Sequence, residues 1–131
     1  MSAPRVMRTA LGRVRNHGAG GEGTGHFVAT RLTSIALAIL APWFVVSAGL
    51  ALRSGSYAAA IDYLANPLNA VGVILLVTVS LYHMSLGMQD VVLDYIARPL
   101  TKVALLVLNT LVPLALGVAA IFAVLSVNFG A

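Results

Sequence analysis

The chain has 131 residues, of which 60 % are hydrophobic and only 9 % are charged, and its mean hydropathy is +0.95. Because a soluble domain carries roughly 25 % charged residues, this composition excludes an ordinary water-exposed surface. The absence of cysteine excludes disulfides, thiolate metal sites, ligated iron–sulfur clusters and covalently attached haem. The net charge of +4 does not indicate a nucleic-acid ligand, because five of the eight basic residues lie within the first 31 positions.

Three long stretches without a charged residue predict the architecture. They cover residues 32–52, 67–89 and 103–131, and each is longer than the roughly 20 residues that a helix needs to cross a bilayer. These runs are continuous and do not alternate between apolar and polar residues, which indicates helices and not barrel strands. We therefore expect an all-α membrane protein with three transmembrane helices.

In chain order, a basic N-terminal segment precedes a membrane domain. The segment covers residues 1–31, and the domain covers 32–131 with helices at about 32–52, 67–95 and 102–127. Residues 53–66 are expected to form a short connection with a turn signal at its start. Pro42 is expected to kink the first helix and Pro113 to interrupt the third, since proline removes a backbone hydrogen bond.

The basic residues predict the orientation. Seven of them lie in the N-terminal segment and in the connection between the second and third helices, whereas only Arg53 lies on the other side. The positive-inside rule therefore places the N-terminus inside, where the basic tail can touch anionic lipids, and the C-terminus outside. We expect a multi-pass protein of the bacterial inner (cytoplasmic) membrane. A signal peptide cleaved after Ala48 and a mitochondrial presequence at residues 1–21 are alternatives.

A glycine pattern in the N-terminal segment imitates a nucleotide-binding motif. Gly18, Gly20 and Gly23 satisfy the G-x-G-x-x-G spacing, but no strand precedes them and a membrane helix follows. We interpret these glycines as a flexible linker.

His83 is the most informative residue, because an ionisable side chain at membrane depth usually faces the interior of a bundle or a functional cavity. On a helix, Gly72, Gly87, Asp90 and Asp94 all lie within about 40° of His83. Small residues beside an imidazole would let a flat ligand such as a haem approach the helix, with His83 as axial ligand. Packing of a partner helix, with His83 as an interhelical hydrogen bond, fits the same stripe.

A haem with two histidine ligands would need a second chain. The other histidines, His17 and His26, lie in the polar N-terminal segment and outside the hydrocarbon. Because this chain offers one imidazole at membrane depth, we expect a hetero-oligomeric helical bundle, with a symmetric homodimer as the alternative.

The second predicted helix and the residue series around it resemble a known family. The series is His83, Gly87, Gln89, Asp94 and Tyr95, followed by Pro99. It is similar to the signature of the small membrane-anchor subunit of succinate dehydrogenase (respiratory complex II), the cytochrome b small subunit. Residues 11–15 and 22–33 also resemble the approach to the first helix in alphaproteobacterial members, except that members often carry two adjacent histidines where this chain has Gly25 and His26.

The resemblance implies roles for four residues. His83 would be one axial ligand of haem b, with the other from the large cytochrome b anchor subunit, and Arg31 would contact a haem propionate. Asp94 and Tyr95 would lie at the ubiquinone pocket, where the Tyr95 hydroxyl would donate to a quinone carbonyl. The residues alone also allow an interfacial belt tyrosine, a solvated acid and a plain positive-inside arginine.

The resemblance also implies partners. The chain would dock the iron–sulfur and flavoprotein subunits of succinate:ubiquinone oxidoreductase and would hold no succinate-oxidising site itself. A fumarate reductase anchor is the alternative within the class. Outside it, a non-redox three-helix membrane protein, such as a transporter or assembly subunit, would use His83 as a proton relay or polar contact.

Overall fold

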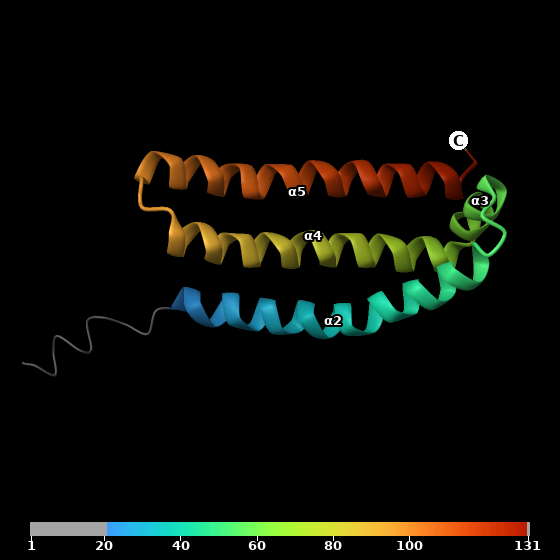
Figure 1. Ribbon diagram of the computed structural model, residues 1–131, viewed down its shortest axis with the longest axis horizontal. Coiled ribbons are helices and arrows are strands. Elements are labelled where there is room, and N and C mark those ends of the chain that lie inside the picture. Colours follow the sequence, from blue (N-terminus) through green and yellow to red (C-terminus); the bar gives the residue numbers. More distant parts are fainter. Residues whose placement is uncertain (1–20, 131) are drawn as a thin grey trace, which may run out of the picture.

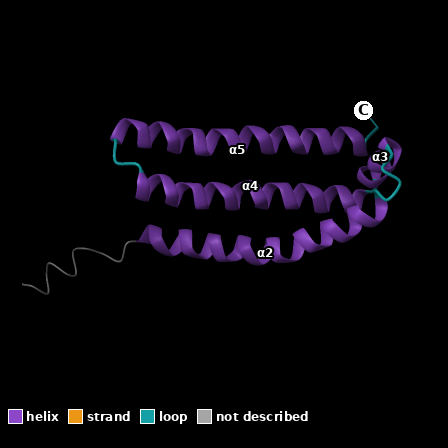
Figure 2. Cartoon of the chain, in the orientation of Figure 1, coloured by secondary structure: helices purple, strands orange, loops and turns teal. Residues whose placement is uncertain are grey.

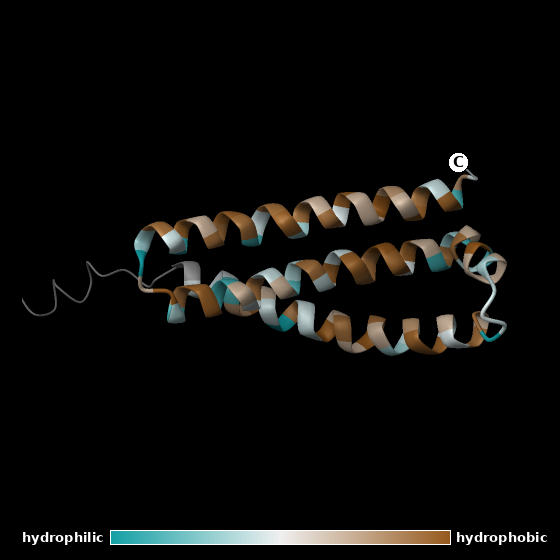
Figure 3. Cartoon of the chain, turned by 45° about the horizontal axis from the view of Figure 1, so that its top comes forward, coloured by the Kyte–Doolittle hydropathy of each residue, from teal (hydrophilic) through white to brown (hydrophobic). Residues whose placement is uncertain are grey.

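The computed structural model describes residues 21–130, and their secondary structure is entirely helical (Figure 2). The helices are α2 (Gly21–Ala51), α3 (Tyr57–Ala65), α4 (Pro67–Tyr95) and α5 (Pro99–Asn128). Of these, α2, α4 and α5 are long and apolar enough to cross a membrane. Hydrophobic residues predominate along all three (Figure 3). The predicted all-α fold with three candidate membrane-spanning helices is confirmed.

The long helices form a single layer with α4 in the middle (Figure 1). Helix α4 packs against both α2 and α5, whereas α2 and α5 do not contact each other. Few side chains are therefore buried, and many large apolar side chains remain exposed on the faces of the layer. In a membrane, those faces are covered by lipid or by the helices of another chain.

Helix α2 begins about ten residues earlier than predicted. The prediction placed its start at residue 32, where the charge-free stretch begins, but the helix starts at Gly21. Gly23 is thus helical and not part of a linker, while Gly18 and Gly20 lie outside the described residues. A hydropathy pattern marks where the hydrocarbon ends, and a helix can continue beyond that edge into the polar region.

The prolines within the long helices do not end them. Helix α2 continues through Pro42 and curves towards its C-terminal end (Figure 1). Helix α5 also continues through Pro113, so the predicted interruption there is wrong. It begins at Pro99, three residues before the predicted start, because a proline at the first helical position loses no intrahelical hydrogen bond. Helix α4 matches its predicted bounds of 67–95.

The connection between α2 and α4 contains a short helix that the sequence pattern did not indicate. Helix α3 is N-capped by Ser56, whose hydroxyl accepts a hydrogen bond from the Ala59 amide. Asn66 then ends α3 and caps α4 by accepting from the Leu68 amide at 2.9 Å. One asparagine therefore separates two helices that run in different directions.

The close approach of α2 to α4 depends on Gly72. A Cβ atom added there would overlap the indole ring of Trp43. Trp43 lies on α2, so its large side chain packs against the bare backbone of α4 at this point. Gly72 therefore serves the packing of α2 against α4 within this chain.

Candidate functional site

His83 forms an interhelical hydrogen bond with α2. Its Nδ1 atom lies 2.7 Å from the hydroxyl oxygen of Thr33, and Thr33 is buried while His83 is half-buried. This contact links the middle of α4 to α2 and lies within the charge-free stretches of both helices. This is the contact expected if His83 forms an interhelical hydrogen bond. It uses only one of the two nitrogens of the imidazole ring. Among the described residues, no group forms a hydrogen bond with Nε2.

The sequence analysis included Thr33 in the family resemblance but assigned it no role. It lies in the first turn of the charge-free stretch. A threonine there does not indicate a contact with another helix, because its hydroxyl can bond to a carbonyl of its own helix. Only the rotation of α2 about its axis shows that Thr33 faces α4. The only sequence signal was a polar residue within an apolar run, and that signal does not indicate which residue it contacts.

Gly72, Gly87, Asp90 and Asp94 lie on the same face of α4 as His83, and we call this face the His83 stripe. Its two glycines have different surroundings. The space beside Gly72 is filled by Trp43, whereas a Cβ atom at Gly87 would meet nothing within 4 Å. Gly87 lies one turn beyond His83 towards the end of α4 that carries Asp94. The stripe is therefore closed on one side of His83 and open on the other. The open side is accessible to a ligand or to a helix from another chain.

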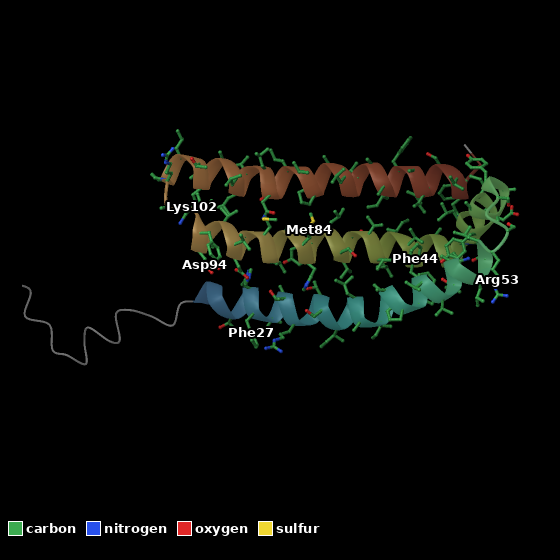
Figure 4. The ribbon with its side chains drawn as sticks, viewed as in Figure 1. Phe27, Phe44, Arg53, Met84, Asp94 and Lys102 are labelled. Atoms are coloured by element: carbon green, nitrogen blue, oxygen red, sulfur yellow. The ribbon has the colours of Figure 1, made fainter. Side chains whose placement is uncertain are left out.

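Asp94 and Tyr95 end α4, eleven and twelve residues beyond His83. That separation corresponds to about 16 Å along the helix axis. Both side chains are exposed, and neither forms a hydrogen bond with another side chain in the described part of the chain. Figure 4 shows Asp94 at the end of the layer where α4 gives way to the connection to α5. The two predicted quinone residues are adjacent to each other but remote from His83.

Arg31 is not brought next to His83. Its guanidinium carbon lies 5.0 Å from the centroid of the Phe27 ring, in a cation–π contact. Phe27 points away from α4 on the outer side of α2 (Figure 4). Thr33 is two positions further along, or about 200° around the helix, which is why it faces α4 while Arg31 does not.

A second contact joins α2 to α4 at the same end of the layer. The Nε2 atom of His26 lies 3.0 Å from a carboxylate oxygen of Asp90, and this carboxylate is more than half exposed. His26 and Thr33 are seven residues apart and thus share one face of α2. The sequence analysis assigned no role to His26; in the structure it pairs with an acid of the His83 stripe.

A groove of about 500 Å³ lies between α4 and α5. Its lining is mostly apolar and includes Leu81, Leu86 and Pro113, together with the polar side chains of Ser85 and Gln89. His83 and Gly87 do not line it, so it opens on another face of α4. Asn109 bridges the two helices nearby by donating to the Ser85 carbonyl at 2.8 Å.

No group of three or more potential metal-ligating side chains occurs in the part of the chain that the structure describes. The chain is a multi-pass helical membrane protein with one imidazole, that of His83, in the middle of its central helix, and this is the class that the fold and the site define.

Comparisons with known proteins identify the family. The family model for the succinate dehydrogenase/fumarate reductase transmembrane subunit matches residues 1–124. A succinate dehydrogenase hydrophobic membrane anchor subunit of Rickettsia bellii (strain RML369-C) is 31 % identical over 86 residues, which are 66 % of this chain and 68 % of the relative. No solved structure matches. The chain belongs to the succinate dehydrogenase/fumarate reductase transmembrane subunit family, and the resemblance inferred from the residues is confirmed.

Proposed function

We propose that this chain is the small membrane anchor of a succinate:ubiquinone oxidoreductase, with His83 as one axial ligand of haem b and with Asp94 and Tyr95 at the site of quinone reduction. The observation that carries the proposal is the position of His83 and the hydrogen bonding of its two ring nitrogens. His83 lies at membrane depth in a family of respiratory membrane subunits, with one ring nitrogen held by Thr33 and the other without a protein partner in the described chain.

The residues around His83 fit a haem. The open flank at Gly87 would let the edge of a porphyrin approach α4 without meeting a side chain. A bound haem would act as a one-electron carrier. Arg31 would contact a propionate, and to do so its flexible side chain would leave the Phe27 ring. The second axial ligand would come from the large cytochrome b anchor subunit, because His26, the other histidine in the described helices, pairs with Asp90 and lies seven residues from Thr33 along α2.

The exposed end of α4 fits a quinone site shared with other subunits. The Tyr95 hydroxyl can donate to a quinone carbonyl, which would stabilise the negative charge that develops there during reduction. Asp94, directly before it, can accept a proton or hold a neighbouring cation in place. Both side chains are exposed in this chain, so the walls of the pocket would come from the iron–sulfur subunit and the large anchor subunit.

The charge distribution supports the same arrangement. Helix α2 begins, α4 ends and α5 begins at one end of the layer (Figure 1), and this end carries Arg31, Arg98 and Lys102. The positive-inside rule places it on the cytoplasmic side of a bacterial inner membrane. The iron–sulfur and flavoprotein subunits would dock there, where succinate is oxidised. A fumarate reductase anchor would use the same residues with electrons flowing in the opposite direction.

The decisive experiment replaces His83 in the assembled complex. His83→Gln keeps a polar side chain that can bond with Thr33 but supplies no imidazole. We expect the purified complex to lose its haem b signal in reduced-minus-oxidised absorption spectra while it still oxidises succinate with artificial dyes. His26→Gln is the matched control and is expected to retain the haem. An unchanged haem signal in His83→Gln would assign His83 to interhelical bonding alone.

A further inference from the structure

The hydroxyl group of Thr33 has more neighbours than it can donate to. Its oxygen lies 2.8 Å from the Ala29 carbonyl, 3.1 Å from the Thr30 carbonyl and 2.7 Å from Nδ1 of His83. A hydroxyl carries one proton and two lone pairs. The two carbonyls can only accept hydrogen bonds, whereas a histidine nitrogen can donate or accept according to its tautomer.

These distances favour one placement of the protons. If the hydroxyl donated to Nδ1, its oxygen lone pairs would face both carbonyl oxygens at hydrogen-bonding distance, which is repulsive. If it donates to its own helix, its oxygen is free to accept from Nδ1–H of His83. This arrangement avoids that repulsion, and Thr33 is buried, where an unfavourable contact between polar groups is costly. His83 then carries its proton on Nδ1, which leaves the lone pair on Nε2.

We propose that Thr33 is a positioning residue that fixes His83 in the Nδ1–H tautomer and so presents Nε2 as the metal-ligating nitrogen. The inference rests on the proposed function, because it matters only if His83 binds haem iron. Thr33 touches neither the iron nor the porphyrin in this scheme. It acts through the imidazole, as carboxylates and carbonyls do behind other metal-binding histidines, where they orient the ring and raise its basicity.

The effect on the haem follows from that basicity. A hydrogen bond from Nδ1–H makes the imidazole a stronger electron donor, and a stronger donor stabilises oxidised iron more than reduced iron. Loss of the bond is therefore expected to raise the midpoint potential of the haem. It is also expected to weaken haem binding by about ten- to a hundredfold, the usual cost of losing such an outer contact.

The test compares three threonine variants in the purified complex. Thr33→Val removes the hydroxyl at nearly constant shape, Thr33→Ser retains it, and Thr30→Val is the matched control. Among the described residues, the Thr30 hydroxyl bonds to the His26 carbonyl of its own helix and to no other group. The measurements are haem b content per complex and the haem midpoint potential from a redox titration. Thr33→Ala provides a second hydroxyl-free variant if Thr33→Val does not assemble.

We expect a positive shift of the potential and reduced haem content in the hydroxyl-free variants, with values near the wild type in Thr33→Ser and Thr30→Val. A tenfold change in the ratio of affinities for oxidised and reduced haem corresponds to about 59 mV. An unchanged potential and haem content in Thr33→Val would overturn the inference, and so would equal shifts in Thr33→Ser and Thr33→Val. Retention of haem by His83→Gln is a separate result, which would overturn the proposed function instead.

Discussion

The two ends of the helical layer satisfy their polar groups in different ways. At the α3 end, the bonds are internal. The hydroxyls of Ser47 and Tyr63 lie 2.7 Å apart, Asn69 donates to the Tyr63 carbonyl, and Asn128 donates to the carbonyls of Leu64 and Ala65. These bonds tie α2, α3, α4 and α5 together within one chain, although Arg53, Tyr57 and Asp62 at this end are exposed.

The opposite end presents several polar side chains at the surface. Asp94 and Tyr95 are exposed, Arg31 rests on Phe27, and the His26–Asp90 pair lies at the surface. Two contacts at this end are internal: the His26–Asp90 pair, and the bond that Lys102 donates to the Leu93 carbonyl across the turn between α4 and α5. Polar groups that a chain leaves without internal partners are available to other subunits or to a ligand. From this comparison we expect substitutions at the α3 end to change stability and substitutions at the end with Tyr95 to change function.

The largest expected effect separates two tyrosines at opposite ends. Tyr95 and Tyr57 are 81 % and 82 % exposed, so they are matched in solvent access. We expect Tyr95→Phe to lower succinate:quinone reductase activity by about ten- to a hundredfold, because a donor to the developing charge is lost. Succinate oxidation by artificial dyes should be unchanged. Tyr57→Phe should leave both rates at the wild-type level, and equal quinone reductase rates for the two variants would remove Tyr95 from the quinone site.

Two glycines of α4 test which flank of His83 is closed. Gly72→Ala places a methyl group against Trp43 and is expected to destabilise the chain by about 1–3 kcal/mol, the cost of overpacking. Gly87→Ala meets open space and is expected to stabilise the isolated chain by about 0.5–1 kcal/mol, since alanine favours a helix. Unfolding of each full-length variant in mixed detergent micelles measures both. A destabilised Gly87→Ala would contradict the open flank.

The helix bounds show how far the sequence could predict the fold. The bounds of α4 were predictable because Pro67 and Pro99 punctuate the chain on either side. The start of α2 was not, because hydropathy reports the edge of the hydrocarbon and the helix continues past it. Helix α3 was missed because its nine residues are too few for a membrane span and are stabilised by a cap at Ser56 and by contacts with distant Asn128.

The site was predictable only in part. His83 stood out because it is an ionisable residue in an apolar run, and that signal is local. Its partner Thr33 lies 50 positions away, and their meeting depends on the rotation of α2 against α4. Roles for Arg31, Asp94 and Tyr95 came from the family resemblance and remain predictions, because the subunits that would complete these sites are other chains.

A smaller effect is expected at the α3 end of the layer. Tyr63→Phe removes the hydroxyl that bonds to Ser47 in a buried position, and we expect a loss of about 1 kcal/mol in unfolding free energy. Tyr82→Phe is the control, because the Tyr82 hydroxyl forms no hydrogen bond among the described residues. Quinone reductase activity should be retained in both. A large loss of that activity in Tyr63→Phe, with stability unchanged, would reverse the roles of the two ends.

The smallest effect is expected at the His26–Asp90 pair. Asp90→Asn removes the carboxylate charge, but Asp90 is 57 % exposed, and an ion pair with that much access to water contributes little. We expect the unfolding free energy to change by less than about 0.5 kcal/mol, as in Asp62→Asn at the other end. A loss well above 1 kcal/mol in Asp90→Asn alone would mean that this pair, and not the Thr33–His83 bond, holds α2 against α4, and the functional end would then also be a structural one.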